Sequence, residues 1–141
     1  MGTTCVLALV IDNKLHVVNV GDSRAYLVND EIFQITKDHT MVMKMYEKGQ
    51  ISKDEIKNHP HRNYLTKAVG VSEQVLPDYY EMDFSENSAV ILCSDGLSNY
   101  CEESDILNVV RSFKSEEVPE QLIKIALNNG GNDNISVAVI R

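Results

Sequence analysis

Residues 5–35 read CVLALVIDNKLHVVNVGDSRAYLVNDEIFQI, and this stretch decides the fold. Apolar, β-favouring runs are separated by short polar turns; the runs cover residues 5–11, 15–20, 25–28 and 31–35. A parallel crossover needs about a dozen residues, so turns this short predict antiparallel pairing of successive strands. The fold is therefore expected to begin as an antiparallel meander.

The rest of the chain mixes helical and strand patterns. Helical spacing or capping signals occur at residues 40–48, after Ser52, and at residues 102–113 and 119–128. Strands are predicted at residues 80–84, 89–93 and 135–140; the second of these is apolar at every position, as in a strand buried on both faces. We expect residues 1–141 to form one α+β domain with antiparallel sheet and helices packed outside it.

Composition excludes several classes of protein. The chain has 141 residues, 43% of them hydrophobic, which argues against disorder, and a net charge of −8, which argues against nucleic acid and anionic membranes as partners. No apolar run approaches the roughly 20 residues that span a bilayer, and no signal peptide is visible. Three cysteines without metal-type spacing indicate a reducing, cytoplasmic location.

Three acidic turns are the candidate functional residues. Asp22 and Asp95 each follow the end of a predicted strand, and Asp133 precedes the start of one. In an antiparallel sheet these ends can share one edge, so the three carboxylates are expected to converge. Oxygen ligands without clustered His or Cys favour Mg²⁺ or Mn²⁺. Taken singly, each of these Asp residues is more often only a turn residue.

Other catalytic signatures are absent from the sequence. The segment Ser94–Ser98 is not the Gly-x-Ser-x-Gly elbow of a serine hydrolase, and no Gly-rich nucleotide-binding loop is present. The four histidines are scattered along the chain. Arg62 and Lys67 carry charges that attract phosphate, although a single basic residue is usually only a solvated surface residue.

Seven short motifs follow one another along the chain: MGTT at residues 1–4, GDSR at 21–24, ITKDHT at 35–40, HPHRN at 59–63, LTKAVG at 65–70, LCSDGLS at 92–98 and GNDNIS at 131–136. Taken together and in this order, they resemble the motifs of the PPM/PP2C metal-dependent protein serine/threonine phosphatases, especially the bacterial branch. The resemblance covers the whole chain.

The resemblance implies a sandwich of two antiparallel sheets flanked by helices. It implies that Asp95 and Asp133 hold a pair of Mn²⁺ or Mg²⁺ ions and that Asp22, with Asp95, holds a weaker third ion. Residues 40–63 would form a flap beside the site, with Arg62 and Asn63 on the substrate side. The reaction implied is hydrolysis of phosphoserine or phosphothreonine in proteins by a metal-bridging water, opposing a serine/threonine kinase.

The resemblance also implies an N-terminally truncated, partial domain. The family has an upstream segment with a phosphate-binding arginine, an acidic metal ligand and an Asp-Gly-x-Gly-Gly motif, none of which is found here. Asn99 stands where some members have an acidic ligand of the third metal. We therefore expect little or no phosphatase activity from the isolated chain, and uncovered sheet edges or apolar faces that promote self-association.

Other functions stay open at this point. The first alternative is a non-catalytic, phosphatase-like regulatory or binding module, which the three retained aspartates disfavour and a naturally short form would favour. A metal-dependent hydrolase of small phosphoesters or nucleotides is the second. A purely structural protein is the third, and it leaves the ordered series of motifs unexplained.

Overall fold

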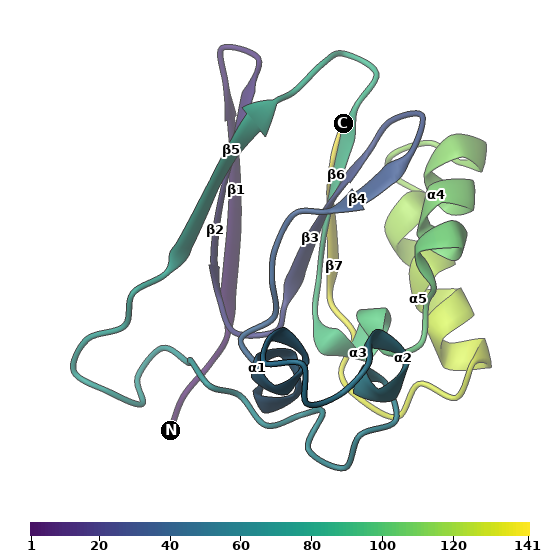
Figure 1. Cartoon of the computed structure of the whole chain (residues 1–141). Coiled ribbons are helices and arrows are strands. Elements are labelled where there is room, and N and C mark those ends of the chain that lie inside the picture. The colour runs from purple at the N-terminus through teal and green to yellow at the C-terminus, as the bar shows by residue number, and fades with distance from the viewer.

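Two antiparallel sheets face each other in the computed structural model, which describes all residues 1–141, and helices add a third layer (Figure 1). The first sheet has the strand order β1-β2-β5, with bounds β1 (Cys5–Ile11), β2 (Lys14–Val20) and β5 (Asp78–Asp83). The second has the order β4-β3-β6-β7, with bounds β3 (Arg24–Val28), β4 (Ile32–Gln34), β6 (Ala89–Cys93) and β7 (Val137–Ile140). The predicted α+β sandwich is confirmed.

The predicted meander is present, but it is divided between the two sheets. β1 and β2 form a hairpin in which Ile11 pairs with Lys14, and the two turn residues Asp12 and Asn13 have φ of 50° and 61°. Two consecutive positive φ angles match the twist of a tight hairpin, and Asp and Asn tolerate them better than most residues. The chain then leaves the first sheet after Val20 and enters the second with β3. The turn that follows β2 therefore connects the two sheets.

The larger core lies between the second sheet and two helices, α4 (Glu103–Ser112) and α5 (Val118–Asn128). Ile106 of α4 and Leu122 of α5 are fully buried there against Ile91 of β6. The smaller core lies between the two sheets and is centred on Leu15 and Val90. β6 contributes alternate residues to both cores, which explains why its sequence is apolar at every position.

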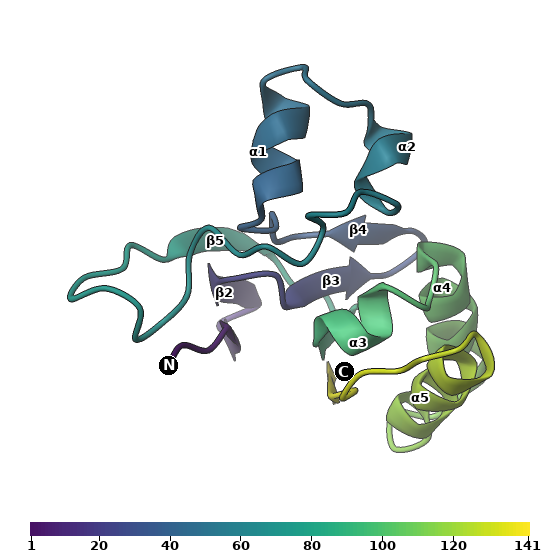
Figure 2. The same cartoon turned by 90° about the horizontal axis from the view of Figure 1, so that it is seen from below.

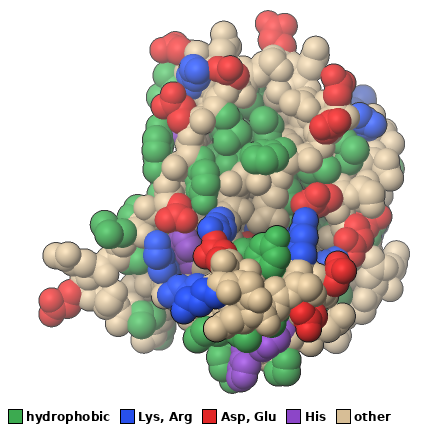
Figure 3. Space-filling model, viewed as in Figure 1, with side chains coloured by type: hydrophobic (Ala, Val, Ile, Leu, Met, Phe, Trp, Pro, Cys, Tyr) green, Lys and Arg blue, Asp and Glu red, His purple; other side chains and the backbone are tan.

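No helix covers the outer face of the first sheet (Figure 1). Leu7, Leu9 and Ile11 of β1 point to this face and are 60%, 56% and 50% exposed. Tyr79 of β5 is 58% exposed on the same face, on the other side of β2. Figure 3 shows hydrophobic atoms along the left side of the molecule, where this sheet lies. β1 is also an edge strand, so both its outer face and its free edge are open.

Three further helices gather at one end of the sandwich: α1 (Met41–Glu47), α2 (Lys53–Ile56) and α3 (Asp95–Ser98). Figure 2 shows α1 and α2 projecting together from this end, away from α4 and α5. The Thr40 side chain caps α1, and Ser52 and Glu55 form the predicted capping box of α2. This end of the molecule carries the residues singled out in the sequence.

Some elements differ from the expectation. The one-turn helix α3 was not predicted, because a turn was expected at residues 94–96. The helix expected at residues 102–113 ends at Ser112, and Phe113 lies beyond it and is 37% exposed. The strands expected at 31–35 and 135–140 are shorter, because their end residues turn toward loops. None of the helices combines the length and the apolar character that a bilayer crossing requires.

Candidate functional site

Asp22 lies in the turn that connects the two sheets, between β2 and β3. Gly21 precedes it with φ of +111°, and a Cβ at this position would lie 2.4 Å from Cγ2 of Thr4. Only glycine adopts this backbone conformation in so confined a place. The glycine therefore fixes the path of the chain into Asp22, whose side chain is half-buried.

Asp95 is the first residue of α3, and Ser94 precedes the helix as its N-cap. Ser94 joins the end of β6 to the loop before β7, because its Oγ accepts a hydrogen bond from Ser136 N at 3.0 Å and donates one to Asn134 O at 3.3 Å. A Cβ on Gly96 would lie 2.2 Å from Asn134 O. Glycine at position 96 thus lets the loop that contains Asp133 approach the start of α3.

The three aspartates interact electrostatically, although they are far apart in the sequence. Partial burial raises the pKa of the Asp22 carboxyl to about 6, and the negative charges of Asp95 and Asp38 act in the same direction. Burial also raises the pKa of Asp95, and the nearby charge of Asp133 adds to this effect. The charge of Asp95 thus acts on Asp22, and the charge of Asp133 acts on Asp95.

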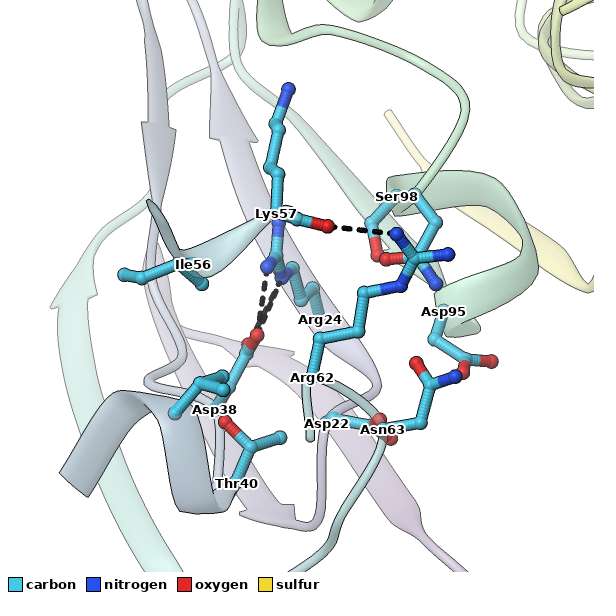
Figure 4. Close-up of a pocket in the computed structure, with 12 residues that line it drawn as sticks. Asp22, Arg24, Asp38, Thr40, Ile56, Lys57, Arg62, Asn63, Asp95 and Ser98 are labelled. Atoms are coloured by element: carbon cyan, nitrogen blue, oxygen red, sulfur yellow. Dashed lines mark hydrogen bonds and ion pairs between the residues drawn. The ribbon is translucent and has the colours of Figure 1, made fainter. Parts of the chain in front are cut away.

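Asp22 and Asp95 line one pocket, together with residues from α1, α2 and the segment after α2 (Figure 4). The pocket has a cavity volume of about 70 Å³. It is much smaller than the several hundred Å³ of a typical organic-ligand site, so it suits ions or a phosphate group better than an extended cofactor. The exposed Asp133 does not line it, which leaves its predicted role as a ligand untested.

Arg24 and Asp38 also line the pocket, and sequence reasoning did not select them. The Arg24 guanidinium donates to both oxygens of Asp38, with Nη2 2.7 Å from Oδ2. Figure 4 shows this pair on the side of the pocket next to Thr40, which precedes α1. The two residues are 14 positions apart in the sequence, and no local pattern signals their pairing.

The predicted substrate-side residues, Arg62 and Asn63, are both part of the lining. The Arg62 guanidinium donates through Nη1 to Lys57 O at 2.8 Å, which fixes the guanidinium beside the end of α2 (Figure 4). Lys67, the other basic residue considered, lies elsewhere and contacts Leu76 O and Asp78. Of these two basic side chains, only Arg62 is in a position to meet an anion at the pocket.

The carboxylate oxygens at the pocket are of the chemical type that a hard divalent cation prefers. Asp22 and Asp95 offer carboxylate oxygens, and their raised pKa values reflect burial and a repulsion that a bound cation relieves. Across residues 1–141, however, no three His, Cys, Asp or Glu side chains are already grouped closely enough to hold a metal ion. The chain supplies fitting oxygen donors but no complete set of ligands.

The model of the family described as "Protein phosphatase 2C" matches residues 1–72, about half of the chain. The chain belongs to the protein phosphatase 2C family. The match includes the Asp22 turn, Asp38 and the α1–α2 segment with Arg62 and Asn63. As a protein phosphatase 2C chain, it has the two-sheet fold expected from the resemblance.

Curated relatives extend the similarity over nearly all of this protein phosphatase 2C chain. The serine/threonine phosphatase stp of Listeria innocua is 38% identical over 142 residues, which is 99% of this chain and 56% of the relative. Protein phosphatase PhpP of Streptococcus pneumoniae is 34% identical over 142 residues, with 99% and 58% covered. The chain therefore spans a little more than half the length of these relatives.

Solved structures of phosphatases share the arrangement. A bacterial serine phosphatase superposes with a TM-score of 0.93 at 38% identity, over 99% of this chain and 57% of the other. The catalytic domain of serine/threonine protein phosphatase PstP, solved with two manganese ions, has a TM-score of 0.86 at 34% identity, over 100% and 60%. The manganese ions belong to that structure.

Proposed function

We propose that this chain carries the metal-binding part of a phosphatase site that hydrolyses phosphoserine and phosphothreonine in proteins. The single observation that carries the proposal is that Asp22 and Asp95 line the same pocket as Arg62 and Asn63. Two carboxylates face a guanidinium and an amide across a small space, which is the combination needed to hold cations and a phosphate together. The membership of the protein phosphatase 2C family supports the same reaction.

Asp95 and Asp133 are the proposed ligands of a pair of Mn²⁺ or Mg²⁺ ions, and Asp22 with Asp95 is the proposed site of a third. The charge of Asp133 acts on Asp95, and the charge of Asp95 acts on Asp22, so Asp95 is the residue that both sites share. When bound, the ions would supply a bridging water of lowered pKa as the attacking group. No nucleophilic side chain is needed for this reaction.

Residues 40–63 form the proposed flap beside the site. They contain α1 and α2 and end with Arg62 and Asn63 at the pocket. In this role Arg62 attracts the phosphate of a phosphorylated protein, and Asn63 orients it through its amide. The hydrogen bond from Arg62 to Lys57 O couples the position of the guanidinium to the end of α2.

The remaining expectations belong to the same proposal. Residues 1–141 form part of one phosphatase domain, since they match 60% of the PstP catalytic domain. We propose that this part alone has little or no activity, because a complete family site draws ligands from more of the domain. The three cysteines are all unpaired, which supports a cytoplasmic location. In the proposed role the complete enzyme opposes a serine/threonine kinase.

A second candidate is a phosphatase-like module that binds partners without catalysis. One observation favours it: no three potential ligands are grouped closely enough to hold a metal ion. If this alternative holds, Asp22 serves only as a turn residue and Asp95 only as the first residue of α3, and the pocket does not bind cations.

Calorimetric titration with Mn²⁺ separates the two candidates. The experiment compares the chain with a double variant, Asp95→Asn/Asp133→Asn. We expect saturable Mn²⁺ binding by the parent chain and its loss in the variant. Absence of binding by the parent chain would support the non-catalytic module.

A matched control removes two carboxylates elsewhere. Asp12→Asn/Asp30→Asn lowers the net negative charge by the same amount, and both residues lie in exposed turns away from the pocket. Mn²⁺ binding unchanged in this control but lost in the first variant assigns the site to Asp95 and Asp133. Equal losses in both variants would instead indicate non-specific attraction by net charge.

A further inference from the structure

One residue, His39, binds both backbone hydrogen-bonding groups of Gly21, the residue before Asp22. Gly21 N donates to Nδ1 of His39 at 3.0 Å, and His39 N donates to Gly21 O at 2.9 Å. The Asn19 side chain donates weakly to the same carbonyl at 3.3 Å. Both polar groups of the glycine preceding a proposed metal ligand are thus satisfied by residue 39.

The hydrogen bonds fix the tautomer of His39. A backbone N–H can only donate, so Nδ1 of His39 must be an unprotonated acceptor. The neutral ring then carries its proton on Nε2 and donates it to Oδ2 of Asp78, 2.7 Å away. The His39 side chain is 8% exposed, so the ring nitrogens are largely shielded from water.

Asp78 is held in turn from a different part of the chain. It begins β5 in the first sheet, and its Oδ1 accepts from Nζ of Lys67 at 3.3 Å. The Tyr80 hydroxyl approaches Oδ2 at 3.4 Å. A continuous chain of contacts therefore runs from Lys67 through Asp78 and His39 to the turn at Gly21.

We propose that His39 is a positioning residue that sets the Gly21–Asp22 turn and thereby the place of the Asp22 carboxylate beside Asp95. Asp78 maintains the required tautomer by accepting the Nε2 proton. The importance of Asp22 rests on the proposed function, but its placement by His39 does not depend on bound metal. The spacing of the four histidines along the chain does not indicate this role.

Two substitutions of His39 test the roles of its two ring nitrogens, Nδ1 and Nε2, one at a time. His39→Asn presents an amide oxygen near the place of Nδ1, so it keeps an acceptor for Gly21 N and loses the donor to Asp78. His39→Gln presents an amide nitrogen near the place of Nε2, so it keeps the donor to Asp78 and loses the acceptor for Gly21. The readouts, taken by NMR on the metal-free full chain, are the hydrogen exchange of the Gly21 amide and the carboxyl carbon shift of Asp22.

His39→Gln should lower the protection of the Gly21 amide by about tenfold, as expected for loss of one buried hydrogen bond. It should also move the Asp22 carboxyl resonance. His39→Asn should retain most of the Gly21 protection and move the Asp22 resonance less. His16→Asn is the matched control, because His16 lies on the outer face of the first sheet and contacts Tyr79; it should change neither readout.

Gly21 protection that is unchanged in His39→Gln would overturn the proposal. An Asp22 resonance that moves equally in both His39 variants would also overturn it, because the effect would then be a general loss of packing. Both readouts are independent of Mn²⁺, so failure of this inference is distinguishable from failure of the proposed metal site. A parent chain that binds no Mn²⁺ would still give a decisive result here.

Discussion

Arg24 holds Asp38 in a two-pronged ion pair, with Nε 2.9 Å from Oδ1 and Nη2 2.7 Å from Oδ2. The Arg24 Nη1 also donates to the Tyr26 hydroxyl at 3.1 Å. Three aspartates line the pocket, but this pairing neutralises one of them and leaves Asp22 and Asp95 as the carboxylates without a cationic partner. The ion pair therefore selects which acidic residues remain available to a cation.

Asp38→Asn is expected to destabilise the chain strongly. Asp38 is 9% exposed, and the Arg24 side chain is 23% exposed, so the substitution leaves a largely buried guanidinium without its counter-ion. Breaking one side of such a pair costs about 3 kcal/mol. Urea denaturation followed by circular dichroism measures the change. Asp83→Asn, which breaks the exposed pair with Lys14, should have a much smaller effect, and equal losses would contradict a special role for the buried pair.

Asp22→Asn is expected to stabilise the metal-free chain. The folded-state pKa of Asp22 is raised from an ordinary 3.8 to about 6, so folding disfavours its charged form, and stability from this group increases as the pH falls from about 6 toward 4. Allowing for the partial exposure of Asp22, the variant should gain roughly 1 kcal/mol at pH 7.5 and little near pH 4. Urea denaturation in EDTA at both pH values measures it. A destabilised variant at pH 7.5 would contradict the repulsion inferred at the pocket.

Asp78→Asn is expected to change the stability in the opposite direction from Asp22→Asn. Partial burial raises the pKa of the Asp78 carboxyl, but the hydrogen bonds from His39 and Lys67, together with the charge of Lys67, outweigh this and lower it. A lowered folded-state pKa contributes stability that is present above the ordinary value of 3.8 and is lost as the pH falls through the folded value. The variant should therefore be less stable at pH 7, and its difference from the parent should shrink below about pH 4. A pH-independent difference would rule out the charge as its cause.

The uncovered face of the first sheet is expected to cause self-association. Leu7 and Leu9 are more than half exposed on the edge strand β1. Sedimentation velocity should show concentration-dependent oligomers of the parent chain, and Leu7→Lys/Leu9→Lys should reduce them. Leu127→Lys is the control, because Leu127 is equally exposed but lies on α5. A parent chain that stays monomeric at all concentrations would contradict the prediction.

The sequence predicted the fold best where one physical signal dominates. The apolar run Ala89–Cys93 gives a strand with the predicted bounds, because both of its faces are buried. The helix α3 escaped prediction because it contains Gly96 and depends on a close backbone contact with Asn134, which no local pattern reveals.

Only part of the site could be predicted from the sequence, because some of its contacts join segments that are far apart along the chain. Asp22 and Asp95 meet at one pocket as expected from the ends of their strands, whereas the role of Asp133 as a ligand stays a prediction. The partners Arg24 and Asp38, and the contact of His39 with Gly21, join segments that only the folded chain brings together. Their selection required the structure.

The pairing of β3 with β6 has a consequence for the site. Asp22 lies two residues before β3 and Asp95 two residues after β6, and these neighbouring strands of the second sheet pair with Arg24 opposite Cys93. The register between β3 and β6 therefore sets the spacing of the two carboxylates. A one-residue slip in this pairing would move one carboxylate by about 3.3 Å relative to the other. The inter-sheet core around Leu15 and Val90 packs the first sheet against this strand pair and so protects its register.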